Sequence, residues 1–339
     1  MKTVILAAGF GSRLWPLSTS EKPKQFQPLF DGVSPLSYTY AVVSKAVPKE
    51  EIYVLGLEGM QELIKAAIPA IDEKRILLVP ERRNTLPHTL WAVAKIAESG
   101  DEPVLFKSGD QFILNEEAFV ASLQNVQAHY ENDTRFTITL LCTKYQTYNS
   151  NDGYCVVDDA GRVAKFLEKP AQADLEQLAA GKTIYRSPFV FIATKNALIR
   201  ELDAATEDWV PIAKEVLQGN AAASKKAFLA MPFIDISSTL FQASQTMRVM
   251  EIRYEFVDVG RFEEVYELNN KDACGNVVLG STILEKSRGN LVINETGRPL
   301  VVIGKENTII VQTPAGSLVS SFADAPLVGE IYKKRILKH

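Results

Sequence analysis

The pattern of hydrophobic positions over the first 145 residues alternates between two periods. Short apolar runs rich in β-branched residues are separated by amphipathic stretches of helical length, which is typical of strands that alternate with helices. The runs lie at residues 3–6, 51–57, 75–79, 103–106 and 136–141. This alternation predicts an α/β fold, a Rossmann-like, mostly parallel mixed sheet flanked by helices.

Residues that favour helix ends stand where these amphipathic stretches begin and end. Ser34 precedes a proline at a first helical position, and Asn84 precedes the stretch that starts with Thr85. A serine or asparagine side chain can accept a hydrogen bond from the first free backbone N–H groups of a helix. Gly100 is where the second of these helices is expected to end.

The pattern changes after residue 153. Strand-like and helical stretches are mixed up to residue 258, as in a substrate-binding half beside the main sheet. Residues 276–320 then carry short apolar strands with turn residues between most of them. We expect a catalytic domain over 1–268 and a small β-rich domain over 269–339, with left-handed β-helix-like coils or a small β-sandwich as the alternatives.

Composition narrows the class of protein. The 339 residues are 46% hydrophobic and 23% charged, and no apolar run reaches the length of a membrane span. The formal net charge of −4 argues against a nucleic-acid partner. Glycines interrupt the apolar start too early for a secretory signal, and the three cysteines lack CxxC spacing, so zinc is not expected. These features predict a cytoplasmic protein without a membrane partner.

The segment from Ala7 to Phe26, AAGFGSRLWPLSTSEKPKQF, follows the first predicted strand. Ligands of open α/β sheets bind at this carboxyl edge, and glycines let backbone amides approach an anion. Leu14 stands where a dinucleotide-binding motif needs its third glycine, and the Walker A pattern does not fit either. Arg13 and Lys24 supply two cations, which favours polyphosphate binding over a structural turn.

This segment closely resembles the signature of the nucleotide-sugar pyrophosphorylases. Its Trp-Pro-Leu-Ser and Pro-Lys-Gln-Phe details are similar to the mannose-1-phosphate guanylyltransferases in particular. The resemblance implies the nucleotide-diphospho-sugar transferase fold and a nucleotide site. The implied nucleotide-binding residues are Ala7, Ala8, Gly9, Gly11, Ser12, Asn84 and Thr85. Asn84 has an alternative structural role as the cap of its helix, and the two roles are compatible.

Later motifs resemble the metal-binding and sugar-binding elements of the same family. The resemblance makes Asp110 and Asp258 ligands of Mg²⁺, although 148 positions separate them in the chain. The Gly-Tyr and Phe-Leu-Glu-Lys-Pro elements correspond to sugar and sugar-phosphate contacts. The implied sugar-phosphate residues are Gly153, Tyr154, Glu168, Lys169 and Arg186. A buried Glu168–Lys169 ion pair is the structural alternative for that element.

Two departures from the family pattern concern the sugar side. Arg186 replaces a neutral amide, and Ser237 stands where the family has an acid. These departures leave two alternative functions: transfer to another sugar or cyclitol 1-phosphate, and a catalytically silent regulatory subunit that binds nucleotide sugar. A third alternative is a nicotinamide-dependent dehydrogenase. Only fold-level likeness suggests the dehydrogenase, and the missing glycine argues against it.

The implied reaction transfers a guanylyl group from GTP to mannose 1-phosphate, giving GDP-mannose and pyrophosphate. The sugar phosphate attacks the α-phosphorus, so no side-chain nucleophile is needed, and the protein must offset repulsion between anions. Arg13 and Lys24 are the predicted catalytic residues, and Mg²⁺ the cofactor. Self-association of family members through the β-rich tail makes a homodimer the expected assembly.

Overall fold

The computed structural model describes residues 1–132, 137–158, 161–178, 181–253 and 255–336. The chain forms two compact units, each made of non-contiguous segments. Unit 1 comprises residues 1–8, 40–109 and 113–256, and unit 2 comprises 9–39, 110–112 and 257–339. The predicted division into 1–268 and 269–339 stays a prediction about the domains.

The elements follow the alternation that the hydrophobic pattern predicted. The strands of the main sheet are β1 (Lys2–Leu6), β2 (Ile52–Leu57), β3 (Ile76–Val79), β4 (Val104–Ser108), β6 (Thr139–Lys144), β7 (Gly153–Val157), β8 (Val163–Glu168), β9 (Thr183–Ser187), β10 (Val190–Ala193) and β11 (Arg248–Glu251). The helices are α1 (Pro35–Val43), α2 (Gln61–Ala67), α3 (Thr85–Ile96), α4 (Glu116–Asn132), α5 (Gln172–Leu178), α6 (Lys195–Ala204), α7 (Val210–Gln218), α8 (Ala221–Ala230), α9 (Phe262–Leu268) and α10 (Val328–Ile331). The short strands β5 (Gln111–Ile113) and β12 (Phe256–Asp258) stand apart from the main sheet.

Unit 1 is built on one mixed sheet with strand order β3-β2-β1-β4-β10-β6-β9-β7-β8, and β11 pairs with β6. The strands β3, β2, β1 and β4 are parallel, and β10 begins the antiparallel part. Residues 2–5 of β1 are buried without interruption because helices cover parallel strands on both faces. The predicted α/β fold with a mixed sheet flanked by helices is therefore confirmed.

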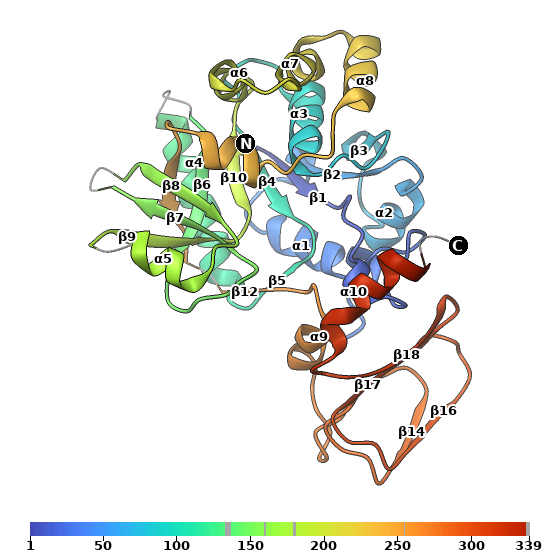
Figure 1. The fold of residues 1–339 in the computed structure, drawn as a ribbon. Helices are drawn as coiled ribbons and strands as arrows, with labels where there is room; N and C mark the ends of the chain where they lie inside the picture. The colour runs from blue at the N-terminus through green and yellow to red at the C-terminus, as the bar shows by residue number, and fades with distance from the viewer. Residues whose placement is uncertain (133–136, 159–160, 179–180, 254, 337–339) are drawn as a thin grey trace. The chain divides into compact units, whose positions relative to one another are not determined.

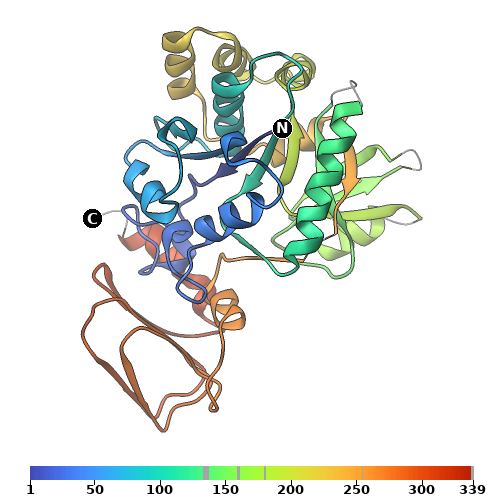
Figure 2. The same ribbon diagram turned by 180° about the vertical axis from the view of Figure 1, so that it is seen from behind.

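The helices of unit 1 form two layers. α3, α6, α7 and α8 gather at one end of the sheet (Figure 1), and Figure 2 shows α4 across the strands on the other face. The core between the sheet and the first group is aromatic, since Phe106 stacks on Phe191 with ring centroids 4.9 Å apart. Trp91 of α3 meets Phe228 of α8 edge-on at 5.1 Å. α3 ends at Ile96, earlier than predicted from Gly100, because Ala97 already has an extended backbone.

One predicted strand falls partly outside the described residues. The run at 136–141 begins on residue 136, which the structure does not describe, and the observed strand is β6. No helix within the described ranges combines the length and the apolar character needed to cross a bilayer.

Unit 2 contains the β-rich tail, whose strands are β13 (Val277–Leu279), β14 (Thr282–Glu285), β15 (Leu291–Asn294), β16 (Leu300–Ile303), β17 (Thr308–Thr313) and β18 (Gly316–Ser321). β13, β15 and β17 are parallel neighbours, β14 pairs with β16 in parallel, and β18 is antiparallel to β17. Figure 1 shows these strands as successive turns of one coil. The pairing matches the predicted β-helix-like coils, whereas a sandwich consists of antiparallel sheets. The predicted left hand of the coils stays a prediction.

Stacked side chains explain why the tail forms coils. Val277, Leu291 and Ile309 are in register on β13, β15 and β17, and each is at most 1% exposed. Asn290 donates to the side chain of Asn276 at 2.9 Å, which joins the corners of successive turns. Gly280 separates β13 from β14 at φ 95°, where a Cβ would lie 2.0 Å from the carbonyl oxygen of Asn294. The corner therefore requires glycine.

Candidate active site

The loop after β1 is held by side chains that hydrogen-bond its backbone. Gln25 Nε2 donates to the carbonyl of Gly9 at 3.0 Å, and the hydroxyl of Ser18 donates to the carbonyl of Phe10 at 2.5 Å. Gln27 Nε2 donates to the carbonyl of Lys22 at 3.1 Å. These three polar residues are nearly fully buried. Buried polar groups with fixed partners make a rigid loop.

Gly11 is the glycine of the loop that the structure requires. It has φ 74°, in the left-handed region, and a Cβ there would lie 2.7 Å from Cγ of Lys24. Gly9 is outside that region and has open space around its Cα. The predicted positive φ is therefore found at Gly11, where the lack of a Cβ lets the Lys24 stem cross the loop. The approach of an anion to the backbone amides stays a prediction.

Lys24 is the centre of a charged cluster in unit 2. Its Nζ lies 2.8 Å from Asp110 Oδ2 and 3.3 Å from Asp258 Oδ1, and it donates to the carbonyl of Val259 at 2.9 Å. The Lys24 side chain is 8% exposed. The predicted convergence of Asp110 and Asp258 is thus confirmed in space, and their ligand role stays a prediction.

The cluster shifts the pKa of the Lys24 ammonium and that of the Asp258 carboxyl group. Burial alone would lower the pKa of Lys24, but the charges of Asp110 and Asp258 outweigh it and raise that pKa well above the ordinary lysine value. The Asp258 side chain is 48% exposed, yet packed groups desolvate its carboxylate. This desolvation, with the like charge of Asp110, raises the pKa of Asp258 against the opposing effect of Lys24. Lys24 is charged throughout the neutral pH range.

The backbone beyond β12 fixes where the Asp258 carboxylate stands. The N–H of Val259 donates to the carbonyl of Asp110 at 3.3 Å, and the N–H of Gly260 donates to Glu264 Oε2 at 3.1 Å. Glu264 also accepts from Nε of Arg261 at 2.9 Å and closes a capping box at the start of α9. The segment 258–261 is therefore a capped turn rather than a free loop.

The two carboxylates next to the buried Lys24 ammonium are groups of the kind that bind Mg²⁺. Magnesium is commonly held by one or two carboxylates, with waters and substrate phosphates completing its octahedron. Asp110 and Asp258 place two such carboxylates on the same ammonium group. Within the described ranges, no group of three or more His, Cys, Asp or Glu residues is arranged to hold a metal ion.

Arg13 follows the glycines in a 3-10 turn, Ser12–Leu14. A Cβ on Gly260 would lie 2.9 Å from Nη2 of Arg13, so the guanidinium lies beside the turn that carries Asp258. Its charge acts on both Lys24 and Asp258. The two predicted catalytic cations therefore belong to one cluster in unit 2.

Unit 1 places the predicted nucleotide-loop residues Asn84 and Thr85 at the start of α3. The side chain of Asn84 accepts from the N–H of Thr85 at 2.9 Å, which confirms the capping role. Thr85 Oγ1 donates to Asp235 Oδ2 at 3.2 Å and accepts from the N–H of Ile236 at 2.9 Å. The α3 start and the segment 235–237 are thus joined, and the contact of Asn84 with base or ribose stays a prediction.

The predicted sugar-side residues lie together on β7, β8 and β9. Gly153 pairs with Glu168, and Tyr154 pairs with Arg186. Lys169 has φ 48° and its Nζ lies 3.1 Å from Glu168 Oε1, with the lysine side chain 58% exposed. Burial and the nearby charges of Asp235 and Asp152 raise the pKa of Glu168, against the effect of Lys169. The two motifs therefore lie on neighbouring strands, and their contacts with substrate stay predictions.

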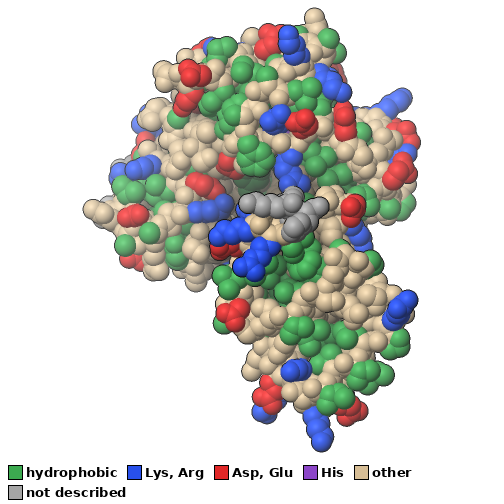
Figure 3. Space-filling model, turned by 45° about the vertical axis from the view of Figure 1, so that its right-hand side comes forward, with side chains coloured by type: hydrophobic (Ala, Val, Ile, Leu, Met, Phe, Trp, Pro, Cys, Tyr) green, Lys and Arg blue, Asp and Glu red, His purple; other side chains and the backbone are tan. Residues whose placement is uncertain are grey.

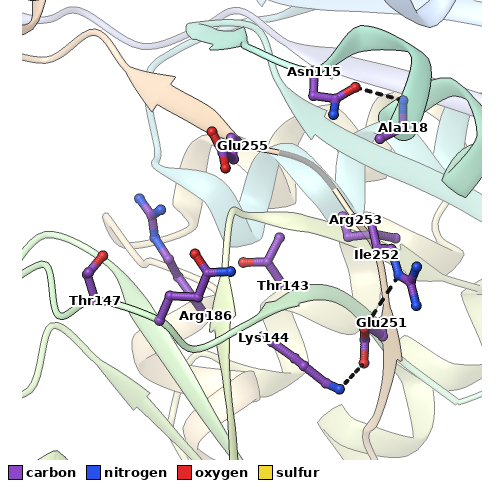
Figure 4. A pocket seen from close by; sticks show the side chains of 11 residues that line it. Asn115, Ala118, Thr143, Lys144, Thr147, Arg186, Glu251, Ile252, Arg253 and Glu255 are labelled. Atoms are coloured by element: carbon purple, nitrogen blue, oxygen red, sulfur yellow. Dashed lines mark hydrogen bonds and ion pairs between the residues drawn. The ribbon is translucent and has the colours of Figure 1, made fainter.

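Arg186 has protein partners that the sequence did not reveal. Its Nε forms an ion pair with Asp152, and its guanidinium lies 4.2 Å above the ring of Phe256. Arg186 lines a cavity of about 450 Å³. Figure 4 shows Thr143 and Glu255 on the wall of the same cavity. A charged residue on β9 is therefore balanced within unit 1, which explains how the strand tolerates the exchange of amide for arginine.

Sequence reasoning gave no role to several residues that shape these sites. Asp152 directly precedes the Gly-Tyr element, and Asp235 lies two positions before Ser237. Their places next to these motifs are the sequence signal that could have identified both acids as site residues. Gln25 and Ser18 lie inside the quoted signature, but nothing in the pattern shows that they bind the loop's own backbone. Glu264 could have been found as the acid three positions after Arg261 in a capping box.

His88 of α3 gives unit 1 a predictable response to acid. It is 5% exposed and stacks on Phe228, and burial lowers its pKa from 6.5 to about 4. The unfolded chain then binds more protons between those pH values, so the free energy of unfolding should fall by about 3 kcal/mol from pH 7 to pH 4 through this residue. Urea unfolding of His88→Gln should show a flatter pH profile. The exposed His129, changed to Gln, is the control, and equal slopes in all three proteins would contradict the assignment.

The chain is similar to known proteins over nearly its whole length. A family model described as Nucleotidyl transferase matches residues 2–274. A Vibrio cholerae protein whose name includes mannose-1-phosphate guanylyltransferase is 28% identical over 99% of this chain and 73% of its own length. A Klebsiella pneumoniae protein named mannose-1-phosphate guanylyltransferase is 28% identical over 93% of this chain and 70% of its own length.

The fold has a full-length counterpart among solved structures. A Thermus thermophilus crystal structure titled mannose-1-phosphate geranyltransferase aligns with a TM-score of 0.80 at 24% identity, covering 100% of this chain and 99% of the other. At that identity the likeness concerns the fold, including the C-terminal strands. The family match spans well over half of the chain. The chain therefore belongs to the nucleotidyl transferase family.

Proposed function

We propose that this protein is a Mg²⁺-dependent guanylyltransferase that joins GTP to mannose 1-phosphate and releases pyrophosphate. The observation that carries the proposal is the cluster in which Lys24 holds Asp110 and Asp258 together beside Arg13. Nucleotidyl transfer between two anions needs fixed cations and a metal rather than a side-chain nucleophile. The names of the relatives at 28% identity support the choice of guanylyl and mannose 1-phosphate.

Each group has a role in this proposal. Asp110 and Asp258 would hold Mg²⁺, which would supply charge to the transferring phosphoryl group. Arg13, with its planar fork, binds the leaving pyrophosphate portion, and Lys24 neutralises charge at the reacting phosphates. In unit 1, Glu168 binds sugar hydroxyls and Lys169 the sugar phosphate. The Lys169 side chain is 58% exposed although it pairs with Glu168, so its ammonium is accessible to an incoming anion.

The reaction is tested by turnover of the purified protein. Pyrophosphate release should be measured with GTP, ATP, CTP and UTP against mannose, glucose and inositol 1-phosphates, with Mg²⁺ present and then removed by chelator. We expect the highest rate with GTP and mannose 1-phosphate and none after chelation. Lack of pyrophosphate release from every pair would reject the enzyme in favour of a silent nucleotide-sugar-binding subunit.

Arg186 favours a second candidate, transfer to a different sugar or cyclitol 1-phosphate. Arginine and its partner Asp152 present a charged donor and a charged acceptor, whereas a side-chain amide presents an uncharged donor and acceptor. A preference for another acceptor in the same panel would select this candidate. NAD binding, which the dehydrogenase alternative requires, is measured in parallel.

We further propose that the protein is a homodimer through its coils and works in the cytoplasm. Ile283, Val301 and Ile303 are 53%, 53% and 64% exposed on adjacent positions of β14 and β16. Figure 3 shows hydrophobic side chains at the surface of the coils, in the lower part of the view. An exposed apolar strip of this kind favours association. Sedimentation equilibrium should give a dimer mass, and a monomer at all concentrations would contradict it.

The cysteines support the proposed cytoplasmic location. Cys142 and Cys155 are free thiols, which fits a reducing compartment.

A further inference from the structure

The C-terminal segment of unit 2 packs on the loop that carries Arg13. Tyr332, which follows α10, is 8% exposed and its ring lies 5.4 Å from that of Phe10 and 6.4 Å from that of Trp15. Phe10 and Trp15 flank the 3-10 turn Ser12–Leu14. The far end of the chain therefore forms part of the wall against which the turn is fixed.

Arg13 itself lies between two positions that have no side chain. A Cβ on Gly329 of α10 would lie 2.9 Å from Cγ of Arg13 and 3.5 Å from its Cα. A Cβ on Gly260 would lie 2.9 Å from Nη2 of the same arginine. Gly329 and Gly260 do not adopt positive φ, so backbone conformation does not require glycine at either place. At Gly329 the space taken by the stem of Arg13 favours glycine, whereas at Gly260 the close atom is the end of a flexible side chain.

The two glycines act on different parts of the side chain. Gly329 admits the stem of Arg13, and Gly260 admits its guanidinium next to the turn after Asp258. Glycine is less favourable than alanine within a helix, so Gly329 is a local cost to α10 that close packing explains. A long arginine side chain has many rotamers, and an anion site benefits when packing selects one of them in advance.

We propose that Gly329 and Tyr332 are positioning residues for Arg13, so that the C-terminal segment prepares the loop for the phosphates of the nucleotide. This rests on the proposed function, in which Arg13 binds the leaving pyrophosphate portion. Gly329 leaves room for the productive orientation of the stem, and Tyr332 holds Phe10 and Trp15 on either side of the turn. A substitution in α10 is therefore expected to weaken binding of the nucleotide phosphates and to leave binding of the sugar phosphate unchanged.

Gly329→Ala is the test, with Ile331→Ala as a matched control because Ile331 is 47% exposed on the same helix. Binding of inorganic triphosphate with Mg²⁺ is measured by calorimetry, and KM for GTP and for the sugar phosphate by pyrophosphate release. We expect Gly329→Ala to weaken triphosphate binding by about tenfold or more and to raise KM for GTP, with KM for the sugar phosphate unchanged. Ile331→Ala should match the wild type. Tyr332→Leu should repeat the effect and replaces Gly329→Ala if that variant does not fold.

A double-mutant cycle separates positioning from general destabilisation. If Gly329 acts through Arg13, adding Gly329→Ala to Arg13→Ala should cause no further loss of triphosphate binding. An equal further loss in the Arg13→Ala background overturns the inference, as does unchanged binding by both Gly329→Ala and Tyr332→Leu. Absence of triphosphate binding by the wild type overturns it too. Wild-type binding that depends on Gly329 without any turnover would reject the proposed function and leave this inference standing.

Discussion

Replacement of Lys24 by methionine is expected to lower kcat/KM for pyrophosphate release by about 10²- to 10³-fold, the usual cost of losing one preorganised charged group. Methionine keeps the length of the stem that crosses Gly11 but removes the ammonium between Asp110 and Asp258. The two carboxylates then repel each other without the cation that lies between them. Lys24→Arg, which keeps the charge with a different geometry, should recover only part of the rate.

The same variant should change metal binding in the opposite direction. In the wild type an incoming Mg²⁺ competes with the Lys24 ammonium for both carboxylates, whereas in Lys24→Met it does not. We expect Lys24→Met to bind Mg²⁺ more tightly in the absence of nucleotide, by about tenfold, as measured by calorimetry. Turnover close to wild type would refute the catalytic role of Lys24. An unchanged or weaker Mg²⁺ affinity would refute the competition.

Lys24→Met should add a pH-dependent contribution to the free energy of unfolding beyond those already present in the wild type. With Lys24 absent, the repulsion raises the folded-state pKa of one carboxylate of the pair. The folded variant then binds more protons than the unfolded chain, so its free energy of unfolding should rise as pH falls from 7 toward 5. This contribution has the opposite sign to that of His88, so urea unfolding is best compared in a His88→Gln background.

The sheet of unit 1 could be predicted from the sequence because its parallel strands are buried on both faces. Such strands appear as continuous apolar runs, as in residues 4–6 of β1 and in β2, and the intervening helices carry their own end signals. The coils of the tail were predicted only as one of two alternatives. Short apolar strands with turns suit both, and the choice depends on pairing in register, such as Val277 with Leu291, which spacing does not encode.

The charged cluster could be predicted by its members but not by its geometry. The signature gave Arg13 and Lys24, and the later motifs gave Asp110 and Asp258, yet nothing local shows that Lys24 binds both carboxylates. Contacts from opposite ends of the chain, such as that of Gly329 with Arg13, leave no local pattern at all. The partner of Arg186 was missed for a similar reason, since its ion pair with Asp152 depends on how β7 and β9 pair.

Replacement of Asp258 by alanine is expected to remove activity to a similar degree while leaving the fold largely intact. Lys24 keeps its ion pair with Asp110 at 2.8 Å, so no buried ammonium is left without a carboxylate. The loss of a single partly exposed carboxylate therefore costs little stability, whereas Lys24→Met leaves two carboxylates facing each other. The two variants should share a catalytic defect and differ in thermal midpoint, with Asp258→Ala closer to the wild type.

Metal dependence is the property that identifies the role of Asp258. With one of two carboxylates gone, Asp258→Ala should need a higher Mg²⁺ concentration for half-maximal pyrophosphate release, and Asp258→Asn should behave likewise because an amide is a weaker ligand for a hard cation. Glu267→Ala on α9 removes an exposed acid of the same unit, one that pairs with Lys271, and should leave both rate and Mg²⁺ dependence unchanged. If Asp258→Ala kept its rate within threefold, or lost its rate with an unaltered Mg²⁺ requirement, Asp258 would not be a metal ligand. Its place next to Lys24 would then be structural, and the proposed metal site would lose one of its two protein ligands.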